Sequence, residues 1–551
     1  MDTHNGLNEQ KILESDVLII GSGPIGAVYA RTITDADKNI HVLMVDMGEQ
    51  GTKLIGDHKK NSIVVQRGSG SFTSTVQGAF GRLSEPVSTA TASEPVAWSV
   101  VRSKSASYNG SSEQLHLNSL PAAPVIREVG GMGSYWSCAT PEQHPAVERS
   151  DLFSDQEWRA LYNQARALFH TTDTAFDYSI RHHLVKNTLV RAHKNREIVN
   201  LPLACHRGTH NLEYLQWTGS ATILGDLADP KYSGGNFELK AQHQCTRLLM
   251  DGASKHIVGA ELINLLTREV ILAKAKKYII CAGAVLTAGI LFNSEIQPHK
   301  GYPALGRYLT EQTMAVGQVV LKDGIIKNAW NDPRCKEHFR TFPDDPLHIP
   351  FNDPSPQITI PVSEKHPWHT QIQQDPFHYN SAPTSTDPRL ILDLRWFGYV
   401  KPVYDNYVEF SSEVTDLFGM PQPTIHYRIG KEDAERAEAM VQDFSRGSMI
   451  NIAADLGDFL PGGKAKFLAP GAATHICGTT RAGKEDDGHS IVDRNSKVWR
   501  LENLFIGGCG VIPTQNACNP TLTAACFAIV GARKVVQELH ALRGQQYQSK
   551  L

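Results

Sequence analysis

The sequence predicts an α/β protein in which a discontinuous dinucleotide-binding domain is interrupted by a second domain. Two observations predict this fold class. Short apolar runs that lead through glycine-rich turns into helix-like patterns occur at three separate places, near residues 20, 280 and 505–540. The segments between them differ in character: residues 151–200 are helix-like and polar-faced, and residues 325–390 are rich in Pro, Asp and His. Dispersed strand–turn–helix pieces of this kind are typical of a doubly wound sheet that carries insertions.

The first of these places contains a β-turn-α-β unit. The run DVLII predicts a buried parallel strand, AVYARTITDA a helix and HVLMVD a second strand. Between strand and helix, Gly21, Gly23 and Gly26 form the pattern G-x-G-x-x-G, whose glycines permit a tight turn, close approach of a pyrophosphate and helix–strand packing. Asp46 ends the second strand, about 20 residues further on, where a carboxylate binds ribose hydroxyls. The unit predicts a dinucleotide site but does not separate NAD from FAD.

The later elements follow in order along the chain. KKYIICAGAVLTAGILF predicts a buried strand that runs into a Gly/Ala-rich helix, and RLILDLRWFGYV and NYVEFS predict strands of a mixed sheet. KEDAERAEAMVQDFSRGSMINIAADLG predicts an exposed helix, NLFIGGCGVIP another buried strand and NPTLTAACFAIVGARKVVQEL a closing helix. Residues 67–120 are rich in Ser, Thr and Gly, so two interpretations stay open: an irregular excursion from the fold or a mobile segment.

These elements define the expected domains. The dinucleotide-binding domain comprises residues 14–66, 121–150, 235–320 and 465–545. The second domain, expected to bind substrate on a mixed or antiparallel sheet with helices, comprises residues 151–234 and 321–464. Residues 67–120 form an insertion.

Composition excludes several function classes. The net charge of the 551 residues is −3, which argues against a nucleic-acid partner and against an anionic membrane surface. No apolar run approaches the roughly 20 residues of a membrane span, and the N-terminal residues have no secretory-signal pattern. The nine cysteines contain no C-x-x-C pair and are odd in number, which indicates reduced thiols in a cytoplasmic protein without a metal site.

Two short motifs near the C-terminus are candidates for chemistry. THICGTTRAG contains His475, and CNPTLT contains Asn519, Pro520 and Thr521. An Asn-Pro step disfavours helix at the Asn and lets a helix begin at the proline, whose positive end suits a flavin ring that gains negative charge on reduction. The residues alone leave the ordinary alternatives open: a buried histidine with satisfied hydrogen bonds, and an asparagine that only caps a helix.

At this point a family resemblance becomes clear. The fingerprint with Asp46, the segment CAGAVLTAGILF and the ending NLFIGGCGVIPTQNACNPTLTA resemble the glucose–methanol–choline (GMC) family of flavin oxidoreductases. The resemblance implies FAD on the Rossmann-like unit and a catalytic His–Asn pair beside it. His475 and Asn519 fall on those two positions.

Within the family, the chain is similar to the pyranose oxidases from about residue 15 to 540. VGGMGSYWSCATP, PWHTQIQQDPFHYNSAP, DPRLILDLRWFG and TDLFGMPQPT carry this similarity. It implies further cofactor contacts from Gly131, Met132, Tyr135, Trp136, Ser137, Cys138, Cys245, Ala282, Asn519, Pro520 and Thr521. On the sugar side it implies Gln371, Asp375, Phe377, Tyr379 and Arg395. Planar hydrogen-bonding groups beside aromatic rings suit sugars, although a plain solvated loop with anchoring aromatics stays the alternative.

The resemblance implies oxidation of a secondary ring hydroxyl, at C2 or C3, of a pyranose or glycoside. His475 acts as base, Asn519 holds the hydroxyl, and O2 (giving hydrogen peroxide) or a quinone takes the electrons. The apparent brevity of the chain and its altered insertion favour glycoside 3-oxidation slightly, in a monomer or small homo-oligomer. An NAD-dependent or other GMC-type alcohol dehydrogenase and a noncatalytic flavoprotein are the alternatives.

One departure from the fungal pyranose oxidases concerns the cofactor. Those enzymes carry, in the GGM motif, a histidine bonded covalently to the flavin, and this chain has Tyr135 there. We therefore expect noncovalent FAD.

Overall fold

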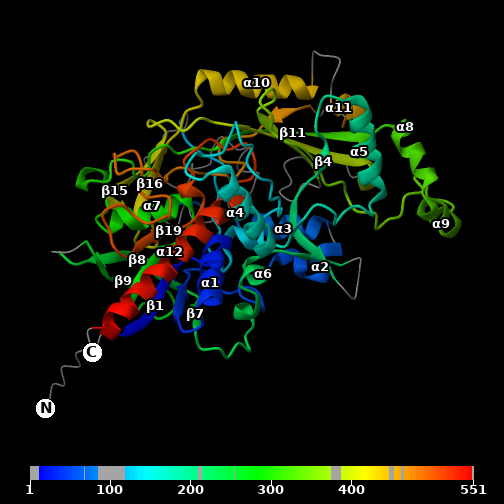
Figure 1. Ribbon diagram of the computed structural model, residues 1–551. Coiled ribbons are helices and arrows are strands. Elements are labelled where there is room, and N and C mark those ends of the chain that lie inside the picture. The colour runs from blue at the N-terminus through cyan, green and yellow to red at the C-terminus, as the bar shows by residue number, and fades with distance from the viewer. Residues whose placement is uncertain are drawn as a thin grey trace.

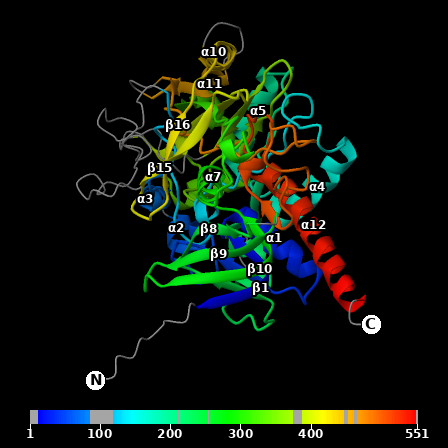
Figure 2. The same cartoon turned by 90° about the vertical axis from the view of Figure 1, so that its left-hand side faces the viewer.

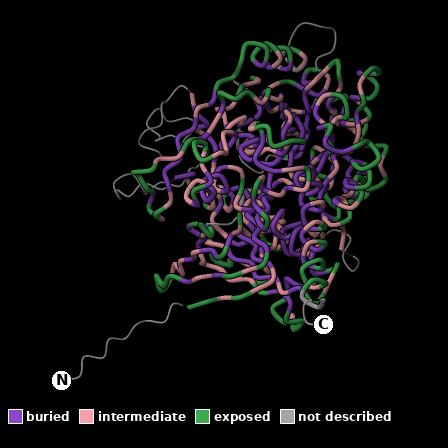
Figure 3. The backbone as a smooth tube through the Cα atoms, turned by 60° about the vertical axis from the view of Figure 1, so that its left-hand side comes forward, coloured by how far each residue is buried: buried purple, intermediate pink, exposed green. Residues whose placement is uncertain are grey.

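The computed structural model describes residues 11–67, 69–84, 118–208, 214–252, 255–373, 386–445, 452–460 and 464–548. Within these residues two seven-stranded sheets organise the molecule. In Figure 1 the first sheet lies in the lower half with α1 and α12, and the second lies in the upper half with α5, α10 and α11. Buried residues run through the interior of both halves, and exposed residues lie mainly at the periphery (Figure 3).

The first sheet has a parallel core and an antiparallel extension. Its strands β7, β2, β1 and β10 lie in this order and run parallel. Strand β19 pairs parallel with the C-terminal residues 278–280 of β10. The N-terminal residues 270–273 of β10 pair antiparallel with β9, which in turn pairs with β8, and Figure 2 shows β8, β9 and β10 side by side. The bounds are β1 Ile12–Ile20, β2 Val42–Val45, β7 Phe237–Lys240, β8 His243–Met250, β9 Ile257–Asn264, β10 Val270–Ile280 and β19 Leu504–Ile506.

Two helices pack together against this sheet. Helix α1 (Pro24–Ala36) follows the first strand directly, and the closing helix α12 (Thr521–Gln548) lies along it. Gly531 lets them approach, because a Cβ there would lie 2.2 Å from the Tyr29 hydroxyl oxygen. The two strands, the turn and the helix of the predicted β-turn-α-β unit are therefore confirmed. The fully buried residues of β1, β2 and α1 form part of the main core.

The second sheet is antiparallel throughout, in the order β17-β11-β14-β13-β12-β4, with β18 also paired to β11. Its bounds are β4 Val199–Asn200, β11 Gln312–Leu321, β12 Ile358–Ile360, β13 Trp368–Ile372, β14 Ile391–Tyr399, β17 Gly457–Phe459 and β18 Lys466–Phe467. Helices α5 (Ile180–Ala192), α10 (Lys431–Ser445) and α11 (Ile452–Leu456) share a core with one face of this sheet. The side chains alternate, so that Leu394 and Trp396 enter that core whereas Arg395 and Phe397 line a cavity on the other face.

The remaining elements are smaller. Strands β15 (Tyr407–Thr415) and β16 (Pro421–His426) form a separate two-stranded sheet, so the prediction that NYVEFS joins RLILDLRWFGYV in one sheet is wrong. Strands β3 (Thr171–Thr172), β5 (Leu203–Arg207) and β6 (Leu215–Trp217) form another. The other α-helices are α2 Ile63–Arg67, α3 Ser69–Ala79, α4 Asp155–Leu168, α6 Ser220–Leu224, α7 Ala284–Asn293, α8 Asp323–Ile326 and α9 Pro333–Thr341.

The structure can be compared with the predicted fold class, domain boundaries and insertion. The fold class, an α/β dinucleotide domain with a second domain on a mixed or antiparallel sheet, is confirmed by the two sheets. The domain boundaries stay predictions, although β11 pairs in the second sheet while lying almost wholly within 235–320. Of the insertion 67–120, residues 69–79 are helical, and residues 85–117 lie outside the described part. No helix in the described part is both long and apolar enough to span a bilayer.

Candidate active site

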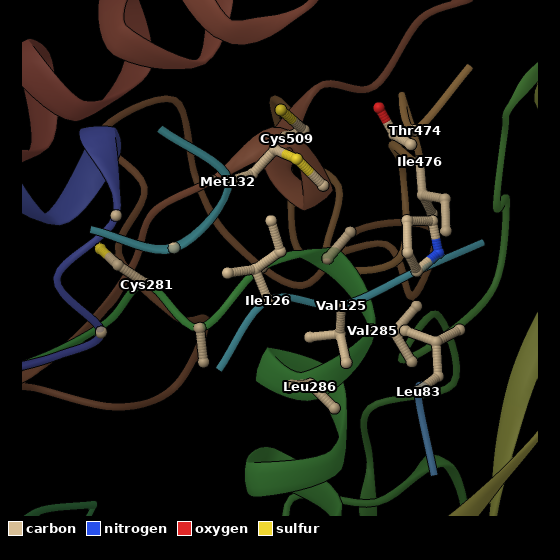
Figure 4. A pocket seen from close by; sticks show the side chains of 18 of the residues that line it. Leu83, Val125, Ile126, Met132, Cys281, Val285, Leu286, Thr474, Ile476 and Cys509 are labelled. Carbon is tan, nitrogen blue, oxygen red and sulfur yellow. The ribbon is translucent and has the colours of Figure 1, made fainter. Parts of the chain in front are cut away.

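A cavity of about 360 Å³ is lined by residues from both sheets. It extends from the fingerprint glycines at the end of β1 to His475 and Asn519, and reaches Gln371 and Arg395 of the second sheet. Much of its wall is apolar. Figure 4 shows Leu83, Val125, Ile126 and Val285 beside α7, and Met132 and Cys509 also line the cavity.

The three fingerprint glycines are needed for different reasons. A Cβ on Gly21, whose φ is +103°, would lie 2.4 Å from the carbonyl oxygen of Cys281. A Cβ on Gly26 would lie 2.1 Å from the carbonyl oxygen of Gly21, so helix and strand could not pack as they do. At Gly23 the nearest protein atom to such a Cβ is 4.0 Å away, and this glycine lines the cavity. Space at Gly23 is thus left for something other than protein.

Asp46 closes the same end of the cavity. Its carboxylate accepts hydrogen bonds from the Ser22 amide at 2.9 Å, the Ser22 hydroxyl at 2.6 Å and the Gly48 amide at 2.8 Å. Burial nevertheless raises the pKa of Asp46 above its ordinary value, because desolvation penalises the charged form. The carboxylate lines the cavity and also ties β2 to the glycine turn.

The residues present fit a dinucleotide cofactor. Helices α1 and α7 begin at the cavity at Gly23 and Gly283, and neither N-terminus has a side-chain cap, so their first amides are available to an anionic pyrophosphate. Gly283 and Gly508 have positive φ and no protein atom within 4 Å of a Cβ. Both line the cavity, where their bare backbone lets a flat ring approach.

The predicted cofactor residues divide into two groups. The following line the cavity: Gly131, Met132, Trp136, Ser137, Cys245, Ala282, Pro520 and Thr521. Tyr135 and Cys138 do not. The Tyr135 hydroxyl donates to Glu128, which also pairs with Lys59, and the Cys138 thiol points to the carbonyl oxygen of Thr218 at 3.6 Å.

His475 and Asn519, which are 44 residues apart, meet at the opposite end of the cavity. The Asn519 side-chain nitrogen lies 3.1 Å from His475 Nε2, and His475 Nδ1 lies 2.7 Å from the side-chain oxygen of Gln312. Burial, with a smaller effect of His369, lowers the pKa of His475 to about 3. The imidazole is therefore neutral at neutral pH and carries a lone pair, and its low pKa makes it a weaker base than an exposed histidine.

Two of the predicted sugar-side residues stand beside this pair. Gln371 of β13 and Arg395 of β14 are directly opposite in register, and both are buried and line the cavity. Gln371 donates to the Asn519 side-chain oxygen at 2.6 Å. The predicted residues Asp375, Phe377 and Tyr379 lie outside the described residues.

Known proteins resemble this chain in sequence and in structure. Residues 402–528 match the family described as GMC oxidoreductase. A pyranose 2-oxidase of Emericella nidulans is 41% identical over 96% of this chain and 93% of its own. The chain belongs to the GMC oxidoreductase family. A C-glycoside 3-oxidase of Arthrobacter globiformis is 28% identical over 95% of each chain.

Among solved structures, a formate oxidase of Aspergillus oryzae shares the fold of this GMC oxidoreductase. The two superpose with a TM-score of 0.66 at 13% identity, covering 97% of this chain and all of the other. The predicted resemblance and fold class are confirmed, and the protein is an oxidoreductase acting on CH–OH groups.

In this GMC oxidoreductase several site residues escaped the sequence analysis. Phe397 lines the cavity, and the Gln312 side-chain oxygen lies 2.7 Å from His475 Nδ1. Gln373 donates to the Gln371 side-chain oxygen at 2.7 Å. The buried Glu311 carboxylate accepts from the amides of His475 at 2.7 Å and of Gln312 at 2.6 Å, and burial raises its pKa to about 7. The signal for Glu311 and Gln312 was the polar run TEQT, which directly precedes the apolar strand MAVGQVVL.

Proposed function

We propose that this GMC oxidoreductase is an FAD-dependent sugar oxidase that converts a secondary ring hydroxyl of a pyranose or glycoside to a ketone. The pyranose 2-oxidases and C-glycoside 3-oxidases that align with nearly the whole chain support this substrate class. The observation that carries the proposal is the hydrogen-bonded His475–Asn519 pair, which faces the same cavity as the fingerprint glycines. Oxygen, giving hydrogen peroxide, or a quinone takes the electrons.

The side chains of the pair have distinct tasks in this proposal. When bound, FAD supplies the acceptor for the hydride of the substrate carbon. His475 Nε2, neutral because burial lowers its pKa to about 3, accepts the hydroxyl proton. The Asn519 amide, at 3.1 Å from Nε2, holds the same hydroxyl oxygen, and such positioning supplies much of the rate.

The cofactor would be held by backbone and by a few polar groups. The amides at the starts of α1 and α7 suit the pyrophosphate, Asp46 suits a ribose, and Pro520 and Thr521 at the start of α12 suit the pyrimidine end of the flavin. Noncovalent binding is supported by the Tyr135 hydroxyl, which is engaged by Glu128. Acid precipitation should release yellow FAD into the supernatant, and a yellow pellet would contradict noncovalent binding.

The proposal also covers the residues that contact the sugar and the ring position that is oxidised. Gln371 and Arg395 contribute hydrogen-bonding groups from adjacent strands, and we expect Asp375, Phe377 and Tyr379 to complete that side. The identity of 41% to a pyranose 2-oxidase, against 28% to a C-glycoside 3-oxidase, favours C2 oxidation of a free pyranose over the glycoside preference inferred from chain length.

An anaerobic screen tests the proposal. Glucose, other pyranoses and an aryl glucoside are mixed with the holoenzyme, bleaching of the flavin band is followed, and NMR locates the new ketone. Oxygen and benzoquinone are then compared as acceptors. Bleaching by at least one sugar is expected. No bleaching by any sugar would indicate a noncatalytic flavoprotein, and no flavin band in the purified protein would return the NAD-dependent alternative.

The cellular setting stays a prediction. All nine cysteines are free, eight of them buried, which agrees with a reducing compartment such as the cytoplasm. We expect a monomer or small homo-oligomer without a nucleic-acid or membrane partner.

A further inference from the structure

The tautomer of the base is set by a residue that the proposed chemistry does not itself use. We infer that Gln312 is a positioning residue that fixes the hydrogen on His475 Nδ1, leaves Nε2 as the proton acceptor, and secures the turn that presents Asn519. The inference rests on the proposed function, which makes His475 the base. It follows from the polarity of a chain of buried amide hydrogen bonds.

The orientation of the Gln312 amide is determined by two main-chain carbonyl groups. Its nitrogen donates to the carbonyl oxygens of Asn516 and Cys518, each at 2.8 Å, and the side chain is only 4% exposed. A reversed amide would place its oxygen against two carbonyl oxygens, none of which carries a hydrogen. Each buried group left unsatisfied costs about 1–3 kcal/mol. The Gln312 oxygen therefore faces His475 Nδ1 at 2.7 Å, and Nδ1 must carry the hydrogen.

The hydrogen bonds on the other side of the imidazole agree with the same tautomer. Gln373 donates to the Gln371 oxygen at 2.7 Å, and Gln371 donates to the Asn519 oxygen at 2.6 Å. Because that oxygen is used as an acceptor, the Asn519 nitrogen is what faces His475 Nε2 at 3.1 Å. A donor there requires a lone pair on Nε2, so this side of the network is compatible with the hydrogen on Nδ1 that Gln312 determines.

This arrangement also prepares the site for the charged imidazole. When Nε2 accepts a proton, Nδ1 keeps its hydrogen and continues to donate it to the Gln312 oxygen, and the bond becomes charge-assisted and stronger. The Gln312 amide nitrogen also donates to the carbonyl oxygens of Asn516 and Cys518, in the turn before Asn519. Gln143 stabilises the same turn by donating to the Asn516 side-chain oxygen at 2.9 Å. One side chain of β11 thus links the base to its partner.

The first test replaces the amide without changing the length of the side chain. Gln312→Met removes the acceptor and both donors, and we expect about a 30-fold slower anaerobic flavin reduction by sugar, with FAD content retained and KM little changed. Gln318→Met is the matched control, since Gln318 lies on the same strand and donates to Asp393 at 2.6 Å instead. The control should reduce at the wild-type rate. A wild-type rate in Gln312→Met would overturn the inference.

A second variant separates positioning from packing. Gln312→Glu restores an oxygen opposite Nδ1 but supplies no donor to the carbonyls. Its reduction rate should exceed that of Gln312→Met, and the acid limb of its pH profile should move to higher pH, because a carboxylate stabilises the imidazolium. Equal losses in both variants, with the acid limb unmoved, would contradict the inference.

A direct measurement on the wild-type protein needs no substrate. Nitrogen NMR of the histidine-labelled holoenzyme, with the His475 signals assigned by their loss in His475→Ala, should show a protonated Nδ1 and an unprotonated Nε2. A hydrogen on Nε2 would overturn the inference. The readout is independent of the proposed function, whose own failure would appear as flavin that no sugar bleaches.

Discussion

The two ends of the cavity are built in different ways. At the cofactor end, Gly21, Gly23 and Gly26 lie within six consecutive residues, and backbone forms the surface. At the reaction end, His475, Asn519, Gln371 and Gln312 come from four distant segments, and the surface consists of side chains joined by hydrogen bonds.

Because of this difference, substitutions at the two ends of the cavity should have different effects. Backbone forms the cofactor end, so a single added methyl group either collides with protein or occupies the space of the cofactor. At the reaction end the side chains of His475, Asn519, Gln371 and Gln312 are joined by hydrogen bonds, so a substitution should leave the fold and reduce the chemistry. The predictions below separate these two kinds of failure.

The largest structural effect is expected at Gly26. Gly26→Ala would place a Cβ 2.1 Å from the backbone oxygen of Gly21, so β1 and α1 must separate. We expect a loss of about 3 kcal/mol in unfolding free energy, against a gain of about 1 kcal/mol in helix propensity, and loss of FAD. Urea unfolding and flavin absorbance measure both, and a stable holoenzyme would contradict the backbone account.

Gly23→Ala is the matched contrast. Its Cβ would have no protein atom closer than 4.0 Å, and the φ of −60° is open to alanine. We expect unfolding of the FAD-free protein at the wild-type urea concentration, but FAD affinity reduced at least about tenfold, because the methyl group takes the place of the pyrophosphate. Unchanged FAD affinity would show that the cofactor does not approach Gly23.

These two glycines also illustrate what could be predicted from sequence. The fingerprint is contiguous, and each glycine has a local steric reason, so spacing alone located it. Gln312 and Glu311 could not be found this way, because their importance depends on Asn516 and His475, which lie more than 160 residues away. Gln371 and Arg395 were identified only through family resemblance.

Two predicted contacts show the limit of resemblance itself. Tyr135 and Cys138 lie in the motif that borders the cavity, yet their side chains turn into other contacts. A motif indicates which segment passes the cofactor, but the local backbone decides which side chains face it. The structure also separates NYVEFS from the strand it was predicted to join, because alternation alone does not specify a pairing partner.

A smaller effect, on the pH dependence of stability, is expected from the buried His369. Burial lowers the pKa of His369 to about 3, below the value of about 6.5 in an unfolded chain. The unfolded state then binds more protons between these values, so stability falls as pH drops from about 6.5 towards about 3. Between pH 8 and pH 5, the unfolding free energy of His369→Gln should fall by about 2 kcal/mol less than that of wild type, as measured by urea unfolding at the two pH values. Equal losses would contradict the burial.

The smallest effect is expected at Tyr135. Tyr135→Phe removes only the hydroxyl that donates to Glu128, and should lower the unfolding free energy by about 1 kcal/mol. FAD content, flavin spectrum and release by acid should match wild type. Loss of a covalently retained flavin in this variant would show that the hydroxyl reaches the cofactor.

The most direct test of the whole account is anaerobic rapid mixing of sugar with His475→Ala holoenzyme beside wild type. His475 lies at the reaction end and does not support the cofactor end, so the variant should bind FAD in full. Its flavin should be reduced by sugar about 10²–10⁴-fold more slowly, the range for loss of a general base. Flavin bleaching at the wild-type rate would remove His475 from the chemistry and contradict the division between the two ends.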